Sequence, residues 1–146
     1  RDLKPENVML SADGPPKIVD FGLARDGATH EELGSTQHPT LTKSGFVVGT
    51  PRYMAPEQAA GGEVDARADV YAFGLVLLDL LNGVGLDPSV PAFRRADAAG
   101  AVARAVVPEL AVVVERCLAF DPAGRYADGR AVVEALSAAA EARGVA

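Results

Sequence analysis

The chain has 146 residues, a length that suits one domain. Its 14 Lys and Arg against 20 Asp and Glu give a net charge of −6, which argues against a nucleic-acid-binding protein, because such proteins usually carry a basic surplus or patch. Hydrophobic residues make up 49% and charged residues 23%, which is typical of a globular domain and too apolar for general disorder. The single cysteine excludes an internal disulfide and suits a reducing, cytoplasmic compartment.

No stretch is a candidate for a membrane span, which needs about 18 consecutive apolar residues without charge. The most apolar stretch, residues 70–81, is shorter and contains Asp79, so we expect a buried helix there. A membrane tether of a parent protein would therefore lie outside this chain. The chain begins at Arg1, inside a motif, which we interpret as the C-terminal part of a longer protein.

The first zone of the chain, residues 1–23, predicts a small β-hairpin. Two short apolar runs, Val8 to Leu10 and Lys17 to Val19, flank an Asp-Gly-Pro-Pro sequence at 13–16 with strong turn chemistry. Such a hairpin would bring Asn7 and Asp20 to the same end.

That end of the hairpin is a candidate magnesium and phosphate site. A carboxylate (Asp20) beside an amide oxygen (Asn7) offers hard ligands for Mg²⁺, which usually fills its remaining positions with water and phosphate. Asp2 would lie within reach as a base, and Lys4 would be a point positive charge for a phosphate.

Residues 24–50 form a second zone, polar and without a sustained period. So long a stretch without regular structure is usually functional or disordered. His30 and His38 lie in it, and because their spacing gives no metal pattern with Cys117, we interpret them as solvated loop residues. Cys117 is expected to be a small residue of the core.

The third zone, residues 51–146, has a helical pattern. Asp65 is placed to cap a helix that runs to Leu81 and ends at Gly83. This helix is apolar on most faces, which predicts a position in the centre of the fold. An alanine-rich segment at 94–107 predicts a weaker helix interrupted by Gly100.

Two further helices follow. Pro108 suits the first turn of one of them. Its predicted inward positions are Leu110, Val113, Val114, Cys117 and Leu118. Asp128 is placed to cap the last helix, which passes through Val132, Val133 and Leu136 and ends near Gly144.

Four motifs, in order, resemble those of the protein kinase family. RDLKPEN at 1–7 resembles its catalytic loop without the preceding His, and Asp-Phe-Gly at 20–22 resembles its metal-binding motif. Ala-Pro-Glu at 55–57 resembles the end of the activation segment, and the sequence at 69–74 resembles the start of the central helix of the C-lobe. The resemblance runs from residue 1 to about 140 and is weakest between 83 and 107.

The resemblance implies a role for each residue of the first motifs. Asp2 would accept the proton of the substrate hydroxyl, and Lys4 would steady the γ-phosphate. Asn7 and Asp20 would hold Mg²⁺, and Met9 would lie under the adenine ring of ATP.

Other residues would have structural roles. Phe21 would pack against the core and set whether the preceding Asp20 points inward. Arg125 resembles the arginine that pairs with the glutamate of the closing motif, here Glu57. Asp69 would accept hydrogen bonds from the backbone N–H groups of Arg1 and its neighbour.

The motifs also indicate the subclass. Lys4 within DLKPEN is the form of the Ser/Thr-directed branch, and so is GTPRYM at 49–54, where Thr50 would hydrogen-bond Asp2 and Lys4.

The stretch at 41–50 resembles bacterial receptor-type Ser/Thr kinases, in which the hydroxyls matching Thr42 and Ser44 become phosphorylated. Arg1 and Arg25 match the positions that receive that phosphate. A plain polar loop is the alternative interpretation of these hydroxyls.

Together these features imply an α+β, protein-kinase-like fold: a predominantly helical C-lobe with a small catalytic-loop hairpin and no N-lobe. Within one domain over 1–146 we expect the catalytic loop and metal-binding hairpin at 1–23, the activation segment at 24–57 and a helical subdomain at 58–146.

The implied function is a Ser/Thr protein kinase that uses ATP and Mg²⁺ on protein substrates, with little activity expected from this fragment alone. A non-catalytic, partner-binding kinase-like module is the alternative. A small-molecule kinase is disfavoured by the intact segment at 49–57, which serves peptide substrates.

Overall fold

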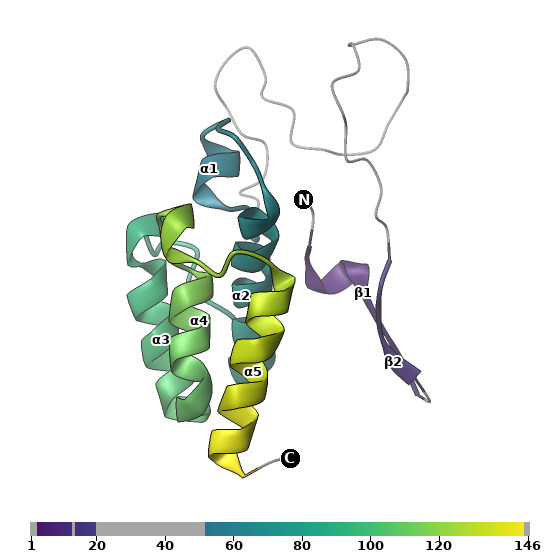
Figure 1. Ribbon diagram of the computed structural model, residues 1–146. Coiled ribbons are helices and arrows are strands. Elements are labelled where there is room, and N and C mark those ends of the chain that lie inside the picture. The colour runs from purple at the N-terminus through teal and green to yellow at the C-terminus, as the bar shows by residue number, and fades with distance from the viewer. Residues whose placement is uncertain (1–2, 13, 20–51, 145–146) are drawn as a thin grey trace.

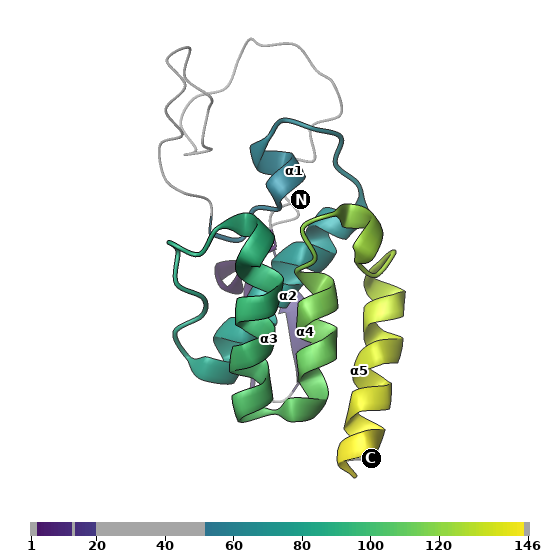
Figure 2. The ribbon, with the colours of Figure 1, turned by 90° about the vertical axis from the view of Figure 1, so that its left-hand side faces the viewer.

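The computed structural model describes residues 3–12, 14–19 and 52–144 (Figure 1). A hairpin of β1 (Val8–Ser11) and β2 (Gly14–Ile18) is followed by helices α1 (Pro56–Ala59), α2 (Ala66–Asn82), α3 (Arg95–Val106), α4 (Ala111–Cys117) and α5 (Gly129–Arg143). Seen from two sides, α3 and α4 lie on one side of α2 and the hairpin lies on the other (Figures 1 and 2). A small sheet beside a helical bundle confirms the predicted α+β class.

The predicted hairpin is present. Strands β1 and β2 pair antiparallel, with Val8 opposite Ile18. Strand β2 begins at Gly14 and includes Pro15 and Pro16, where the sequence predicted a turn. Proline fits here because each strand of a two-stranded sheet has one edge whose N–H groups need no ladder partner.

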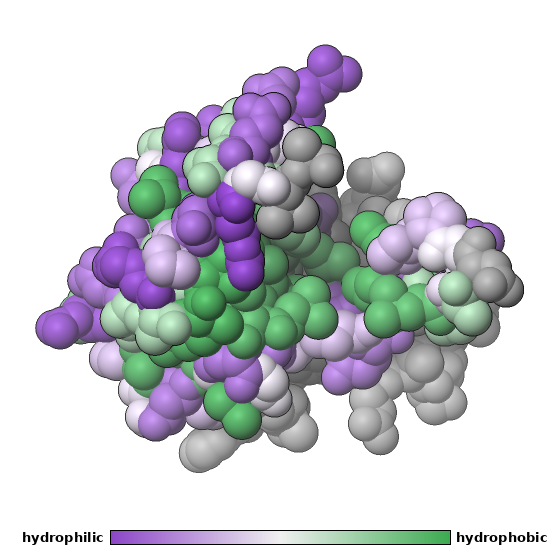
Figure 3. Space-filling model, turned by 90° about the horizontal axis from the view of Figure 1, so that it is seen from below, coloured by the Kyte–Doolittle hydropathy of each residue, from purple (hydrophilic) through white to green (hydrophobic). Residues whose placement is uncertain are grey.

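The hairpin carries exposed apolar side chains. Met9, Leu10 and Ile18 are 58%, 76% and 51% exposed. Seen from below, the hairpin and the neighbouring helical bundle both show apolar surface (Figure 3). A lone two-stranded hairpin is at best marginally stable in water, so packing against another element would be needed to hold this one firmly.

Helix α2 begins and ends as its sequence predicts. The Asp65 side chain accepts a hydrogen bond from the backbone N of Arg67 at 2.8 Å, and Gly83 closes the helix at φ 74°. Leu80, however, is 77% exposed, so one face of the helix is not covered by the described residues. None of the helices described here is long and apolar enough to cross a membrane.

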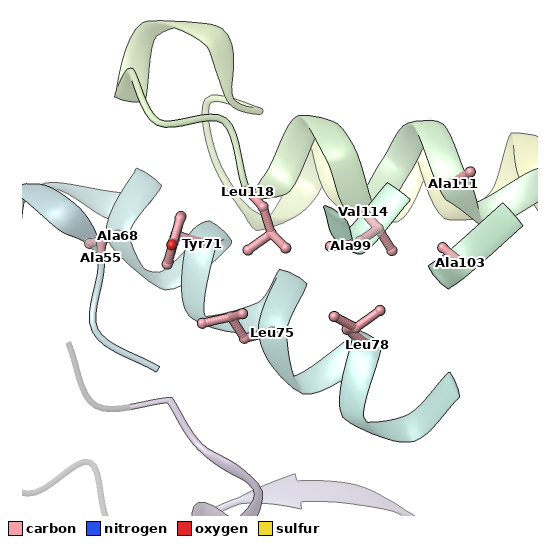
Figure 4. Close-up of a cluster of buried hydrophobic side chains, with 10 residues drawn as sticks. All are labelled: Ala55, Ala68, Tyr71, Leu75, Leu78, Ala99, Ala103, Ala111, Val114 and Leu118. Carbon is pink, nitrogen blue, oxygen red and sulfur yellow. The ribbon is translucent and has the colours of Figure 1, made fainter. Parts of the chain in front are cut away.

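The main core forms where α2 meets α3 and α4 (Figure 4). Its largest fully buried side chains include Tyr71 and Leu78 of α2 with Val114 and Leu118 from the α4 region. Gly74 allows the close approach of α2 to α4, because a Cβ there would lie 2.7 Å from Cβ of Cys117. The predicted central position of α2 is confirmed.

Helix α3 corrects one prediction: Gly100 does not interrupt it. Residue 100 lies in the middle of the continuous helix Arg95–Val106 and is buried. A Cβ at this position would collide with the Glu115 side chain of α4. The glycine is therefore a contact point between two helices, and its low helix propensity is offset by packing.

Helices α4 and α5 largely follow their predictions. A 3₁₀ turn at Pro108–Leu110 leads into α4, whose Val113, Val114 and Cys117 are buried. The Asp128 side chain accepts from the backbone N of Ala131 at 3.0 Å and begins α5. The last helix ends at Gly144, with φ 75°. Of its predicted apolar residues, Val132 is buried and Val133 is 62% exposed.

Burial should make the Cys117 thiol unreactive. The side chain is fully buried, and this burial raises its pKa to about 12, so little reactive thiolate forms near neutral pH. We expect iodoacetamide to leave Cys117 unmodified in the folded protein and to modify it in urea, as measured by mass spectrometry. Equal labelling rates with and without urea would contradict the buried position.

Candidate active site

The loop before the hairpin is shaped by proline and by local hydrogen bonds. Lys4 is extended and half-buried, and Pro5–Asn7 forms a 3₁₀ turn in which the Asn7 N–H donates to the Lys4 carbonyl at 3.0 Å. Proline suits this first turn because its φ is fixed and its missing N–H needs no partner there. Asn7 is 6% exposed, so the turn holds a polar amide inside the protein.

Asn7 is joined to the second strand at the open end of the hairpin. The backbone N of Val19 donates to the Asn7 carbonyl at 2.8 Å. Asp20 is the next residue in sequence. The hairpin therefore ends with Asn7 beside the residue that precedes the predicted metal-binding aspartate, although Asp20 lies outside the described residues. Met9, the predicted adenine contact, lies two residues beyond Asn7 with an exposed side chain.

Several predicted site residues lie outside the described part of the chain. They are Arg1, Asp2, Asp20, Phe21, Arg25, Thr42, Ser44 and Thr50, together with His30 and His38. Asp69 is described, half-buried in the first turn of α2. Its predicted backbone partners at Arg1 and the neighbouring residue are not, so that prediction stays a prediction.

The predicted ion pair between Glu57 and Arg125 is present. Two parallel hydrogen bonds join Nη1 to Oε1 at 2.7 Å and Nη2 to Oε2 at 2.8 Å. The Arg125 side chain is 0% exposed and that of Glu57 is 15% exposed. The same guanidinium donates to the carbonyls of Arg67, Ala119 and Phe120. Arg125 thus ties α1, the start of α2 and the α4–α5 connection together.

This geometry sets the charge state of Glu57. Desolvation favours the neutral carboxyl and raises its pKa, but the hydrogen bonds and charge of Arg125 outweigh it, and the net pKa lies below the ordinary 4.5. A carboxyl with a lowered pKa stabilises the fold above its ordinary pKa and loses that contribution as the pH falls through the folded value.

We therefore expect the pair to weaken in acid. The free energy of unfolding in urea should fall as the pH is lowered from neutral to below 4.5, the ordinary pKa of Glu57. A Glu57→Gln variant should be less stable at neutral pH and should lose less stability on acidification. If acidification lowered the free energy of unfolding of the variant and of the wild type by equal amounts, the coupling of Glu57 to Arg125 would be contradicted.

A second cluster, which the sequence did not reveal, fastens the segment after residue 51. The Tyr53 hydroxyl donates to Oδ2 of Asp79 at 2.5 Å, and Arg52 Nη2 binds Oδ1 of the same carboxylate at 3.2 Å. Arg52 also donates to the Val84 carbonyl at 2.7 Å. Burial, followed by the hydrogen bond to Asp79, raises the pKa of Tyr53 to about 12.

Gly85 makes room for this cluster. Its φ is +72°, and a Cβ there would collide with both Arg52 and Asp79. The only sequence signal for the cluster was one aspartate in the otherwise apolar stretch 70–81, and its partners lie 26 and 27 residues away.

Comparison with known proteins decides the family. The model of the protein kinase domain matches residues 1–136. The chain belongs to the protein kinase family. The match includes the loop before the hairpin, Glu57 and Arg125, and it confirms the resemblance inferred from the motifs.

Bacterial Ser/Thr protein kinases are among the similar relatives. The kinase chain is 38% identical, over 97% of its length, to the serine/threonine-protein kinase PknL of Mycobacterium tuberculosis, of which it covers 35%. It is 39% identical, over 86% of its length, to serine/threonine-protein kinase PknB of Mycolicibacterium smegmatis, of which it covers 20%. It is also 36% identical, over 94% of its length, to serine/threonine-protein kinase pkn3 of Myxococcus xanthus, covering 27%. The chain thus spans about a third or less of the length of these relatives.

Proposed function

We propose that this chain is the C-lobe of a cytoplasmic Ser/Thr protein kinase that, in its complete form, transfers the γ-phosphate of ATP to Ser or Thr hydroxyls of proteins. The backbone hydrogen bond from the N–H of Val19 to the carbonyl of Asn7 is the observation that carries the proposal. It supports a site in which Asn7 and Asp20, the residue that follows Val19 in sequence, face the same phosphates. Under this proposal residues 1–23 hold the catalytic loop and metal-binding hairpin, 24–57 the activation segment and 58–146 the helical subdomain.

Each residue of the site has a chemical task that suits its side chain. Asp2 would accept the proton of the substrate hydroxyl, and Lys4 would attract the γ-phosphate through its positive charge. Asn7 and Asp20 supply the amide and carboxylate oxygens that suit Mg²⁺. The ion they would hold would supply positive charge that offsets the negative charge of the phosphates.

Two further groups complete the proposal. Thr50 would hydrogen-bond Asp2 and Lys4, beside the substrate hydroxyl. The hydroxyls of Thr42 and Ser44 would accept phosphate, which would bind Arg1 and Arg25 and order the activation segment. A phosphate brings up to two negative charges and three acceptor oxygens, so pairing with arginines is a physically reasonable switch.

The proposal is tested by phosphate transfer in the full-length protein. The protein is incubated with Mg²⁺, ATP labelled on the γ-phosphate and a generic basic protein substrate, and the labelled amino acids are identified after hydrolysis. We expect label on serine and threonine. Absence of transfer by a folded full-length protein would favour the non-catalytic, partner-binding alternative.

A further inference from the structure

The turn that follows α2 is held by the half-buried side chain of Asn82, the last residue of the helix. Its amide oxygen accepts hydrogen bonds from the backbone N of Val84 at 3.2 Å and from that of Gly85 at 2.7 Å. Its amide nitrogen donates to the Gly85 carbonyl at 2.9 Å. One side chain thus fixes both of the peptide groups that flank Val84.

These hydrogen bonds determine where the Val84 carbonyl points. The carbonyl of Val84 and the N–H of Gly85 belong to one peptide group, which is trans like every other described here. A trans peptide group is planar, so its C=O and its N–H point in opposite directions. Because Asn82 binds the N–H on one side, the carbonyl faces the other side, where it accepts from Nη2 of Arg52 at 2.7 Å.

Arg52 depends on this carbonyl for its position. Its side chain is 45% exposed, and its other hydrogen-bond partner is the Asp79 carboxylate at 3.2 Å. The ring of Tyr53 lies 5.7 Å from the guanidinium carbon, near the outer limit of a cation–π contact. Exposed ion pairs contribute little, and holding a long side chain in one geometry costs rotamer freedom. The shorter bond to the Val84 carbonyl is therefore the contact whose loss would release Arg52.

We propose that Asn82 is a positioning residue of the kinase: by directing the Val84 carbonyl toward Arg52, it holds the segment at 49–54 for protein substrates. The inference rests on the proposed kinase function, under which that segment lies beside the substrate hydroxyl. Among the described residues Asn82 makes no hydrogen bond to Arg52 itself, so its effect passes through the carbonyl. The proposed ligands of Mg²⁺ and ATP, Asn7 and Met9, belong to the hairpin region, so nucleotide binding should not depend on Asn82.

The alternative is a turn whose only role is stability. Such a turn would change the amount of folded protein, and with it kcat for every substrate, without raising KM for one substrate alone. The two roles of Asn82 are therefore separated by KM for the protein substrate against KM for ATP.

The experiment measures steady-state phosphate transfer by the full-length protein to a protein substrate. We expect Asn82→Ala to raise KM for the protein substrate about tenfold and to leave KM for ATP unchanged, because a hydrogen bond to a charged group is lost. Asn82→Asp keeps an oxygen that accepts from both N–H groups, so it should retain most of the wild-type behaviour. Arg52→Met removes the donor, and adding Asn82→Ala to it should cause no further loss, because both changes break one chain of contacts.

Asp128→Ala provides the matched control for lost stability. It removes a side-chain hydrogen bond to the backbone at another helix end, the start of α5. It should lower the midpoint of urea denaturation and leave both KM values unchanged.

Two results would overturn the inference. If Asn82→Ala left KM for the protein substrate at the wild-type value, or if its effect multiplied with that of Arg52→Met, Asn82 would not act through Arg52. If the wild type transferred no phosphate to any protein, the proposed function itself would fail, and this inference with it.

Discussion

Replacing Arg125 with alanine is expected to lower the free energy of unfolding by about 3–5 kcal/mol, which is the usual cost of breaking a buried ion pair by removing one partner. The variant loses both hydrogen bonds to Glu57 and leaves a carboxylate only 15% exposed without its counter-charge. It also leaves three carbonyls, one at the start of α2 and two in the α4–α5 connection, without their donor. Denaturation in urea, followed by circular dichroism, measures the change.

One further variant separates geometry from charge, and a second compares the buried pair with an exposed one. Arg125→Lys keeps the positive charge but cannot form the planar fork, so we expect it to recover only part of the stability. Arg104→Ala removes the pair with Glu115, whose side chains are 54% and 30% exposed, and exposed pairs contribute only about 0–1 kcal/mol. Equal losses from Arg125→Ala and Arg104→Ala would show that the buried pair contributes no more to stability than an exposed one.

The second large effect concerns the 146-residue chain on its own, which is expected to transfer no measurable phosphate. Phosphoryl transfer depends on positioning and on charge stabilisation by several groups at once. The sequence contains no Gly-x-Gly-x-x-Gly motif to cover the phosphates. Met9, the proposed adenine contact, is 58% exposed. It would contact one face of the adenine ring, with no described residue to contact the other face.

The measurement compares the isolated chain with the full-length protein, using labelled ATP, Mg²⁺ and the same protein substrate. An Asp2→Asn variant of the isolated chain gives the background. Incorporation clearly above that background would show that the C-lobe suffices, and the requirement for a second half of the site would be wrong.

Helix ends were the most predictable part of the fold. Asp65 and Asp128 each accept a hydrogen bond from the backbone of the first turn, and Gly83 and Gly144 adopt the left-handed conformation just after the last turn. These signals depend on residues within one turn of each other, so the sequence displays them directly.

Predictions failed where a distant segment determined the outcome. Gly100 lies inside a continuous helix and leaves room for the Glu115 side chain, and no local pattern shows that contact. The same holds for Asp79, which the sequence showed only as a charge in an apolar stretch and which binds Arg52 and Tyr53. Glu57 and Arg125 are 68 residues apart, and their pairing was predictable only because both belong to recognisable motifs.

Under the proposed function, Asp2 acts as the base in phosphate transfer to Ser and Thr. The direct test compares initial rates of transfer by full-length wild type and Asp2→Asn, with Asp97→Asn, an exposed position in the first turn of α3, as the matched control. We predict that Asp2→Asn lowers kcat by about 10²–10⁴-fold while nucleotide affinity is retained, because only the proton acceptor is lost. The control should keep the wild-type rate. Transfer by Asp2→Asn at the wild-type rate would show that Asp2 is not the proton acceptor.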